Sequence, residues 1–226
     1  VKHTIARVRN PEYYEQIHLL REELGLSMTV NPERIAAREI SHLLRFPSAI
    51  NVEMMARGRI ELVEIRLGHG SPLIGQALKE LSAAYRVKVL ICSVERDGQV
   101  FIPFGDFVLQ ENDRINMTAS PEEMKRFFEK ANIYRSPIKS VMVVGGGRIA
   151  HYLANELHGI GVGMKLIETD RARCQTLSET LPFVTVVYGD GTDERLLQEE
   201  GIDHSGAFVA LTGIDEENII AAMYAV

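Results

Sequence analysis

A glycine-rich triplet, Gly145-x-Gly147-x-x-Ala150, carries the clearest chemistry in the sequence. It comes directly after an apolar run and opens an amphipathic helical pattern, which is the setting in which such glycines bind phosphates. Gly145 permits a tight turn, Gly147 lets the backbone approach a phosphate, and Ala150 keeps helix and strand close. The first turn of the helix also offers N–H groups and a positive dipole end to an anion. We therefore expect a phosphate-binding loop formed by Gly145, Gly146, Gly147, Arg148 and Ile149.

An acidic residue, Glu168, ends the next apolar run of this region. It follows Gly147 by about 20 residues, the spacing at which a carboxylate accepts hydrogen bonds from the ribose of a bound nucleotide. A carboxylate there also repels a 2′-phosphate, so the pattern favours NAD(H) or another adenine nucleotide over NADP(H). The alternative is a glycine turn that serves only the packing of helix against strand.

Polar residues follow the third and fourth apolar runs: Asp190, Gly191 and Thr192 come after the third, and Thr212 after the fourth. The carboxyl ends of parallel strands form the edge where such sheets hold ligands, so we expect these residues beside the glycine loop. Two interpretations of Asp190 stay open, a ligand for adenine or sugar and a cap for the following helix. Arg148 likewise could contact a phosphate or a partner's acid, or be a solvated surface charge.

These residues need a parallel sheet to bring them together, and residues 138–226 carry its pattern. Four strand-like runs alternate with four helical patterns, which predicts an α/β fold with a Rossmann-like, doubly wound parallel sheet. A complete sheet of this kind usually has five or six strands. We therefore expect a truncated sheet whose remaining strands lie outside this chain.

Residues 48–132 have a different pattern, with strands and helices in the order β-β-α-β-β-β-α, and predict a small α+β domain. Asp97-Gly98 is typical of a two-residue hairpin turn because both positions tolerate positive φ. We expect one helix over residues 72–84 and a buried strand over residues 87–94, with Cys92 in the core.

Residues 1–46 contain two strand-like runs, each followed by an Asn-Pro-Glu helix start. These starts predict helices over residues 11–24 and 32–45, the second with Leu43 and Leu44 on its apolar stripe. So few strands cannot close a core of their own, so this segment must belong to a larger layer.

Composition narrows the classes of function. The chain has 226 residues, a net charge of -6 and two cysteines, which argues against a nucleic-acid-coating surface and a disulfide framework. No apolar run approaches the length of a membrane span, so we expect a soluble, cytosolic protein.

The seven histidines are scattered, and no nucleophile-base set falls on the expected site edge, so we expect no catalysis. The alternative is a fragment of an NAD-dependent dehydrogenase or an S-adenosylmethionine-dependent methyltransferase, since both use a similar cofactor loop.

With these residues in view, the chain resembles the peripheral subunits of Trk-type potassium uptake systems and their wider family of domains that regulate potassium conductance (RCK, or KTN). The resemblance covers nearly the whole chain. It rests on residues 5–13, 141–149, 166–170, 189–193, 209–212 and 215–218. One departure is Ala150, where the family more often has glycine.

The resemblance implies a non-enzymatic, cytoplasmic regulator that binds NAD(H) or ATP/ADP. It implies gating of a membrane potassium-translocating subunit of the TrkH, TrkG or KtrB kind, which would hold the regulator at the inner face of the plasma membrane. It also implies self-association into a homodimer or tetramer, without nucleic acid. On this resemblance Gly145, Gly147 and Arg148 match the phosphate loop, Glu168 the ribose acid, and Asp190 and Thr212 the nucleotide edge.

The resemblance also implies a domain map. Residues 1–46 would be the end of a first nucleotide-binding domain with its crossover helices. Residues 48–132 would be a small RCK C-terminal domain, and residues 138–226 the start of a second, Rossmann-type nucleotide-binding domain. The chain would then be an internal fragment of a longer protein.

Overall fold

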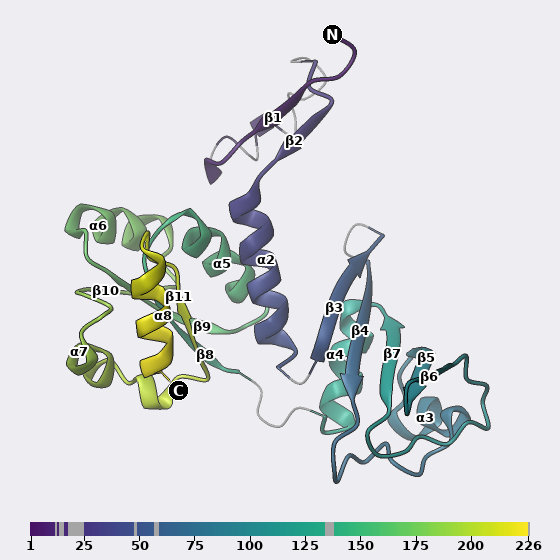
Figure 1. Ribbon diagram of the computed structural model, residues 1–226. Helices are drawn as coiled ribbons and strands as arrows, with labels where there is room; N and C mark the ends of the chain where they lie inside the picture. The colour runs from purple at the N-terminus through teal and green to yellow at the C-terminus, as the bar shows by residue number, and fades with distance from the viewer. Residues whose placement is uncertain are drawn as a thin grey trace. The chain divides into compact units, whose positions relative to one another are not determined.

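The computed structural model describes residues 1–11, 13, 16–17, 25–47, 49–56, 59–133 and 138–225 (Figure 1). It forms two compact units, one of Val1–Arg45 with Ile138–Val226 and the other of Phe46–Pro137. Most of the helix predicted over residues 11–24 lies outside the described residues. Among the residues that are described, no helix is both long and apolar enough to cross a membrane.

The first unit contains a four-stranded parallel sheet. Its strands are β8 (Ser140–Val144), β9 (Gly163–Glu168), β10 (Thr185–Tyr188) and β11 (Ala207–Ala210), in the spatial order β10-β9-β8-β11. The strand order reverses beside β8, and in doubly wound sheets ligands bind at this switch point. The Rossmann-like architecture expected from the sequence is confirmed.

Helices cover both faces of this sheet (Figure 1). They are α5 (Arg148–Gly159), α6 (Arg171–Thr180), α7 (Glu194–Glu199) and α8 (Asp215–Tyr224), with a 3-10 turn at Ile202–His204. Val141 and Val143 of β8 pack in one core cluster with Leu153 of α5. Met142 and Val144 pack in another with Leu197 of α7. β8 is therefore buried on both faces, which explains its continuous apolar sequence.

The N-terminal segment forms a separate parallel pair, β1 (Ile5–Arg7) and β2 (Met28–Val30), followed by α2 (Pro32–Arg45). α2 packs along α5. Asn31 caps α2 by accepting from the N–H of Arg34, and its amide donates to the Tyr152 hydroxyl at 2.8 Å. Ala37 of α2 is buried in the core. Leu43 was predicted on the buried apolar stripe of this helix, but its side chain is 61% exposed.

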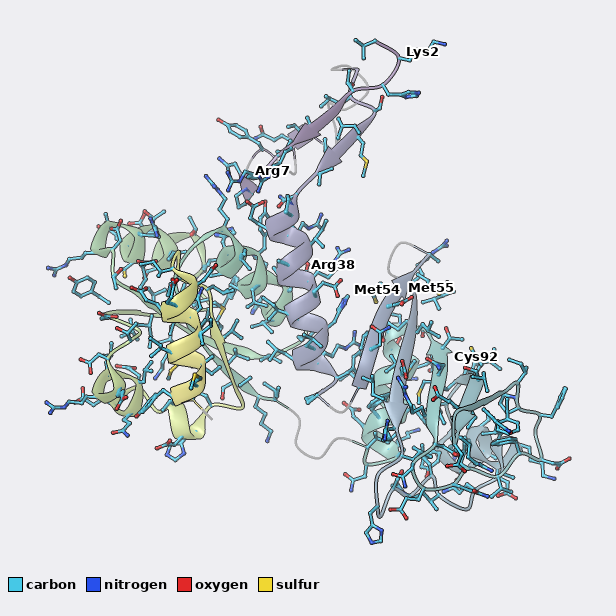
Figure 2. The ribbon with its side chains drawn as sticks, viewed as in Figure 1. Lys2, Arg7, Arg38, Met54, Met55 and Cys92 are labelled. Atoms are coloured by element: carbon cyan, nitrogen blue, oxygen red, sulfur yellow. The ribbon has the colours of Figure 1, made fainter. Side chains whose placement is uncertain are left out.

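A buried acid begins α2. Arg9 and Arg7 donate to Oε1 of Glu33 at 2.7 and 3.1 Å, and Arg7 is labelled in Figure 2. Burial alone would raise the pKa of Glu33, but the hydrogen bond from Arg9 and the charges of both arginines outweigh it and hold that pKa below its ordinary value. The ion pairs therefore join the end of β1 to the start of α2.

The second unit is an antiparallel α+β fold. Its elements are β3 (Ala49–Met55), β4 (Ile60–Arg66), α3 (Leu78–Tyr85), β5 (Leu90–Arg96), β6 (Gln99–Phe101), β7 (Arg114–Ala119) and α4 (Pro121–Lys130). The strands lie in the order β3-β4-β7-β5-β6. Asp97 and Gly98 both have positive φ and join β5 to β6, so the predicted hairpin is confirmed.

A buried ion pair lies at the turn end of this hairpin, at the last residue of β5. Asp113 is fully buried, and both of its oxygens accept from Arg96, at 2.7 and 2.8 Å. The N–H of Gln110 donates to the same carboxylate at 2.8 Å. Because the pair is bidentate and hydrogen-bonded, its geometry compensates the desolvation of the acid.

Three predictions for this unit need correction. The helix predicted over residues 72–84 begins only at Leu78, because the preceding residues form turns that include Gly75 with φ of 82°. The strand predicted over residues 87–94 begins at Leu90, whose side chain is 63% exposed. Cys92, predicted in the core, is only partly buried (Figure 2). An apolar run did not distinguish a strand buried on both faces from one with an open face.

Candidate functional site

A cavity of about 490 Å³ opens at the carboxyl edge of the parallel sheet. It is lined by residues from the loops after all four strands. Most of the predicted site residues line it: Gly145, Gly146, Gly147, Glu168, Asp190, Gly191, Thr192 and Thr212. The topology thus brings together residues that are up to 67 positions apart in the sequence, as 145 and 212 are.

Two of the three glycines in the loop are closely packed, and the third has open space beside it. A Cβ at Gly145, where φ is 95°, would lie 2.5 Å from the carbonyl oxygen of Leu211. A Cβ at Gly146 would lie 2.6 Å from a methyl group of Leu177 and 2.9 Å from Oε2 of Glu168. At Gly147 a Cβ would meet nothing within 4 Å among the described residues. Gly145 is therefore required by the backbone, a side chain at Gly146 would need Leu177 and Glu168 to move, and Gly147 leaves open space.

Gly147 is also the N-cap of α5, and it supplies no side-chain hydrogen bond to the first turn. The N–H groups at the start of a helix have no partner within the helix, and the helix dipole places partial positive charge there. Open space, N–H donors and positive potential together suit a phosphate group.

Glu168 spans from the end of β9 to this loop. Its Oε2 accepts from the N–H of Gly146 at 2.7 Å and its Oε1 from the N–H of Asp170 at 2.8 Å. Burial raises the pKa of Glu168, but these hydrogen bonds, the Arg173 charge and the Thr169 hydroxyl outweigh it, and the pKa lies below its ordinary value. The carboxylate is therefore ionised at neutral pH although its side chain is only 5% exposed.

Asp190 is held by its own loop and does not cap the next helix. Its Oδ1 accepts from the N–H of Thr192 at 2.9 Å and from its hydroxyl at 2.7 Å, and both bonds keep the pKa of Asp190 below its ordinary value. Asp193 is the N-cap of α7 and accepts from the N–H of Arg195. Of the two interpretations of Asp190, the helix cap is therefore excluded, and the carboxylate lies at the cavity.

Thr212 lies at the opposite side of the cavity, after β11. Asn218 of α8 accepts from its N–H at 2.8 Å and donates to its carbonyl at 3.2 Å. Gly191 packs so closely on Val144 that a Cβ would lie 2.0 Å from a methyl carbon. These contacts hold the loops after β10 and β11, both of which line the cavity.

Two predicted site residues lie outside the lining. Arg148 is exposed on the first turn of α5, and Ile149 packs against the core below it. Two charged residues outside the predicted set, Arg173 and Glu217, also line the cavity. The signal for Arg173 was its position in the first turn of the helix that follows Glu168.

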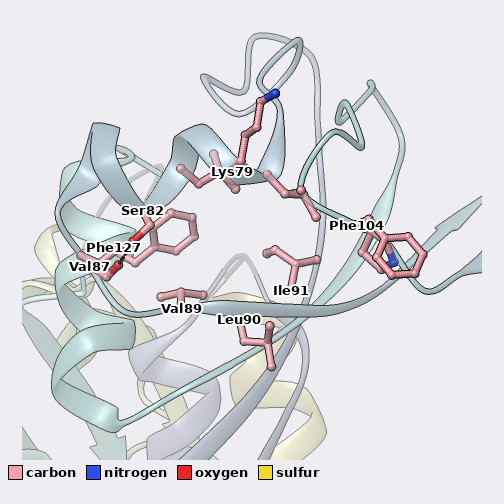
Figure 3. Close-up of a pocket in the computed structure, with 12 residues that line it drawn as sticks. Lys79, Ser82, Val87, Val89, Leu90, Ile91, Phe104 and Phe127 are labelled. Carbon is pink, nitrogen blue, oxygen red and sulfur yellow. Dashed lines mark hydrogen bonds between the residues drawn. The ribbon is translucent and has the colours of Figure 1, made fainter.

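A second cavity, of about 200 Å³, lies in the unit of residues 46–137 (Figure 3). Its walls are mainly apolar and include Val89, Ile91 and Phe127, with Lys79 and the 84% exposed Phe104 also contributing. Lys79 already donates to Asp106. None of the predicted site residues lies there.

Comparison with known proteins agrees with both units. The TrkA-N domain family matches residues 141–226, and the TrkA-C domain family matches residues 62–132. The chain is 34% identical over 228 residues to the Trk system potassium uptake protein TrkA of Haemophilus influenzae, covering 98% of this chain and 49% of that protein. It is 34% identical over 223 residues to the TrkA homolog of Archaeoglobus fulgidus, covering 98% and 50%.

Solved structures share the fold. The crystal structure of the GsuK RCK domain superposes with a TM-score of 0.56 at 23% identity, covering 97% of this chain and 46% of that one. The GsuK channel bound to NAD gives a TM-score of 0.55 at 23% identity, covering 96% and 37%.

The domain matches define a chain built from a TrkA-C and a TrkA-N domain, and its fold is similar to that of the GsuK RCK domain. Residues 62–132 therefore belong to the TrkA-C domain family and residues 141–226 to the TrkA-N domain family. It spans about half the length of the curated relatives that it matches.

Proposed function

We propose that this chain is the nucleotide-sensing part of a regulator of potassium uptake and that it binds NAD(H) in the cavity at the sheet edge. The observation that carries the proposal is the bridge from the Glu168 carboxylate to the N–H of Gly146, directly beside the open N-terminus of α5. A ribose acid and a phosphate cradle within one cavity of about 490 Å³ suit a dinucleotide.

The choice of nucleotide follows from charge and from a solved relative. The ionised Glu168 accepts from ribose hydroxyls and repels a 2′-phosphate, so NAD(H) is favoured over NADP(H). The GsuK channel, which shares the fold, has been solved bound to NAD. ATP or ADP is the second candidate, because the same loop and acid also suit an adenine mononucleotide.

We propose that the cavity binds its ligand without transforming it. Among the described residues that line it there is no histidine, cysteine or lysine, and the carboxylates of Glu168 and Asp190 are already held by hydrogen bonds from their own loops. No observation at this site favours the dehydrogenase or methyltransferase alternative. The chain would therefore serve as a regulator.

The link to potassium rests on the relatives, which are named Trk system potassium uptake proteins. We propose a cytoplasmic chain that acts on a membrane potassium-translocating subunit and assembles with further copies as a homodimer or tetramer. A nucleotide can regulate the membrane subunit only if it binds one arrangement of the domains more tightly than another. The coupling free energy then shifts the state of the membrane partner.

Calorimetric titration of NADH, NAD, ATP and ADP into the chain tests the proposal. We expect at least one to bind, and Glu168→Ala to weaken it by about tenfold to a hundredfold, the range for lost hydrogen bonds to a charged group. Glu199→Ala, which removes an exposed acid on α7, is the matched control and should bind like wild type. Equal binding by wild type and Glu168→Ala contradicts the site, and binding of none of the four contradicts the function.

A further inference from the structure

The guanidinium of Arg173 stands between two carboxylates at the end of the cavity that holds Glu168. Its Nη1 lies 3.3 Å from Oε2 of Glu168, and its Nη2 lies 3.9 Å from Oδ2 of Asp170. Among the described lining residues, Arg173 is the one that carries a positive charge. Its side chain is 52% exposed, whereas that of Glu168 is 5% exposed. The acid is thus buried and fixed, while the cation beside it is free to exchange partners with solvent.

The carboxylate of Glu168 is fully engaged in the structure. Oε1 accepts from the N–H of Asp170 and, at 3.3 Å, from the hydroxyl of Thr169, and Oε2 accepts from Gly146 and Arg173. A carboxylate has about four acceptor positions. A ribose hydroxyl can therefore bind Glu168 only in place of a present partner. The exposed Arg173 is more readily displaced than the two backbone N–H groups, whose positions are set by the loop and by β9.

We propose that Arg173 is a specificity-determining residue that acts with Glu168 to select what the ribose carries at its 2′-position. The proposal rests on the nucleotide site proposed above. Glu168 supplies the negative charge that rejects a 2′-phosphate, and arginine at this end of a Rossmann sheet is the residue type that holds one. The site carries both residues, and the ion pair between them masks the arginine. Selection of the 2′-hydroxyl therefore depends on the balance of these two charges.

The two residues have opposite expected effects. Glu168→Gln removes the repelling charge and frees Arg173, so binding of NADPH should tighten while binding of NADH weakens. Arg173→Gln leaves Glu168 without its cation, so binding of NADPH should weaken further while binding of NADH stays level or tightens. We expect the preference for NADH over NADPH to fall by about tenfold in Glu168→Gln and to rise by about tenfold in Arg173→Gln. Each change corresponds to one hydrogen bond that involves a charged group.

Titration of NADH and NADPH into wild type, Glu168→Gln, Arg173→Gln and the double variant tests this inference, because the two probes differ only in the 2′-phosphate. In the double variant the gain in NADPH binding should disappear. Arg171→Gln is the matched control, since this guanidinium lies over the ring of Tyr188, 5.9 Å from its centroid, and is outside the cavity lining. Thermal unfolding of each variant shows that it is folded.

The ratio of the two affinities is the informative readout. A merely structural role for Arg173 would weaken both nucleotides alike and leave the ratio unchanged. If wild type binds NADH and Arg173→Gln changes the ratio by less than about twofold, the inference is overturned and the proposed function stands. If wild type binds neither NADH nor NADPH, the proposed NAD(H) site fails and this inference falls with it.

Discussion

Substitution of two glycines in one loop by alanine should have two different effects, one on stability and one on nucleotide binding. Gly145 has φ of 95° and faces the Leu211 carbonyl, where a Cβ would lie 2.5 Å away. Gly147 has φ of -73°, which any residue adopts, and a Cβ there would meet nothing within 4 Å among the described residues. Gly145→Ala should therefore damage the fold, and Gly147→Ala should damage only nucleotide binding.

The magnitudes follow from these contacts. At Gly145 alanine has about 1 to 2 kcal/mol of left-handed backbone strain and about 1 to 3 kcal/mol of overlap, so we expect a loss of about 3 kcal/mol in the free energy of unfolding. That corresponds to a melting temperature lower by roughly 10 °C for a unit of this size. At Gly147 the stability should change by less than about 1 kcal/mol. Binding of NADH should weaken by about tenfold or more there, because the methyl group occupies the space of the phosphate.

Thermal unfolding followed by circular dichroism and titration of NADH measure the two effects on the same samples. If Gly145→Ala has the same melting temperature as wild type, the backbone does not require glycine at this position. If Gly147→Ala binds NADH as tightly as wild type does, the phosphate does not lie beside Gly147. Loss of stability in Gly147→Ala would show that the open space at this position is filled by some other part of the protein.

Three further predictions concern stability. Asp113→Asn should destabilise the second unit by about 3 kcal/mol in urea unfolding, because Arg96 loses its buried anionic partner; an unchanged midpoint would refute this. Asn31→Ala should lower the free energy of unfolding by about 2 kcal/mol, because it removes the N-cap of α2 and the hydrogen bond to Tyr152. Asn31→Asp should recover about half of this loss because it keeps the N-cap. Glu33 has a folded pKa below its ordinary value of 4.5, so its contribution is present above about pH 4.5 and is lost as the pH falls through the lowered folded pKa. Glu33→Gln should lower the free energy of unfolding in the neutral range, where this contribution is present, and should flatten the acid part of a profile of stability against pH.

Much of the first unit was predictable because its sequence is locally consistent. Polar or glycine residues follow its apolar runs, and α6 and α7 begin with the aspartate caps Asp170 and Asp193, so propensity and pattern agree there. The same consistency located Glu168, since the end of a strand also fixes the place of its last side chain at the sheet edge.

Tertiary contacts decided what sequence reasoning missed. Leu43 falls on the apolar stripe of α2 by spacing, yet the helix presents Ala37 to its neighbour, and only the packing partner settles that choice. Leu90 reads as core because it lies in an apolar run, but its face of β5 is open. Arg173 gained its place in the site from an ion pair with Glu168, which no spacing rule specifies.

Backbone amide chemical shifts, recorded by NMR during a titration with NADH, test the central claim most directly. The two cavities lie in different units, so their signals can be followed separately. The account predicts saturable shifts at Gly145, Gly146, Gly147 and Asp190, with the amides around Lys79 and Phe104 unchanged. Shifts confined to the residues around Lys79 and Phe104, or none at any of these residues, would contradict it.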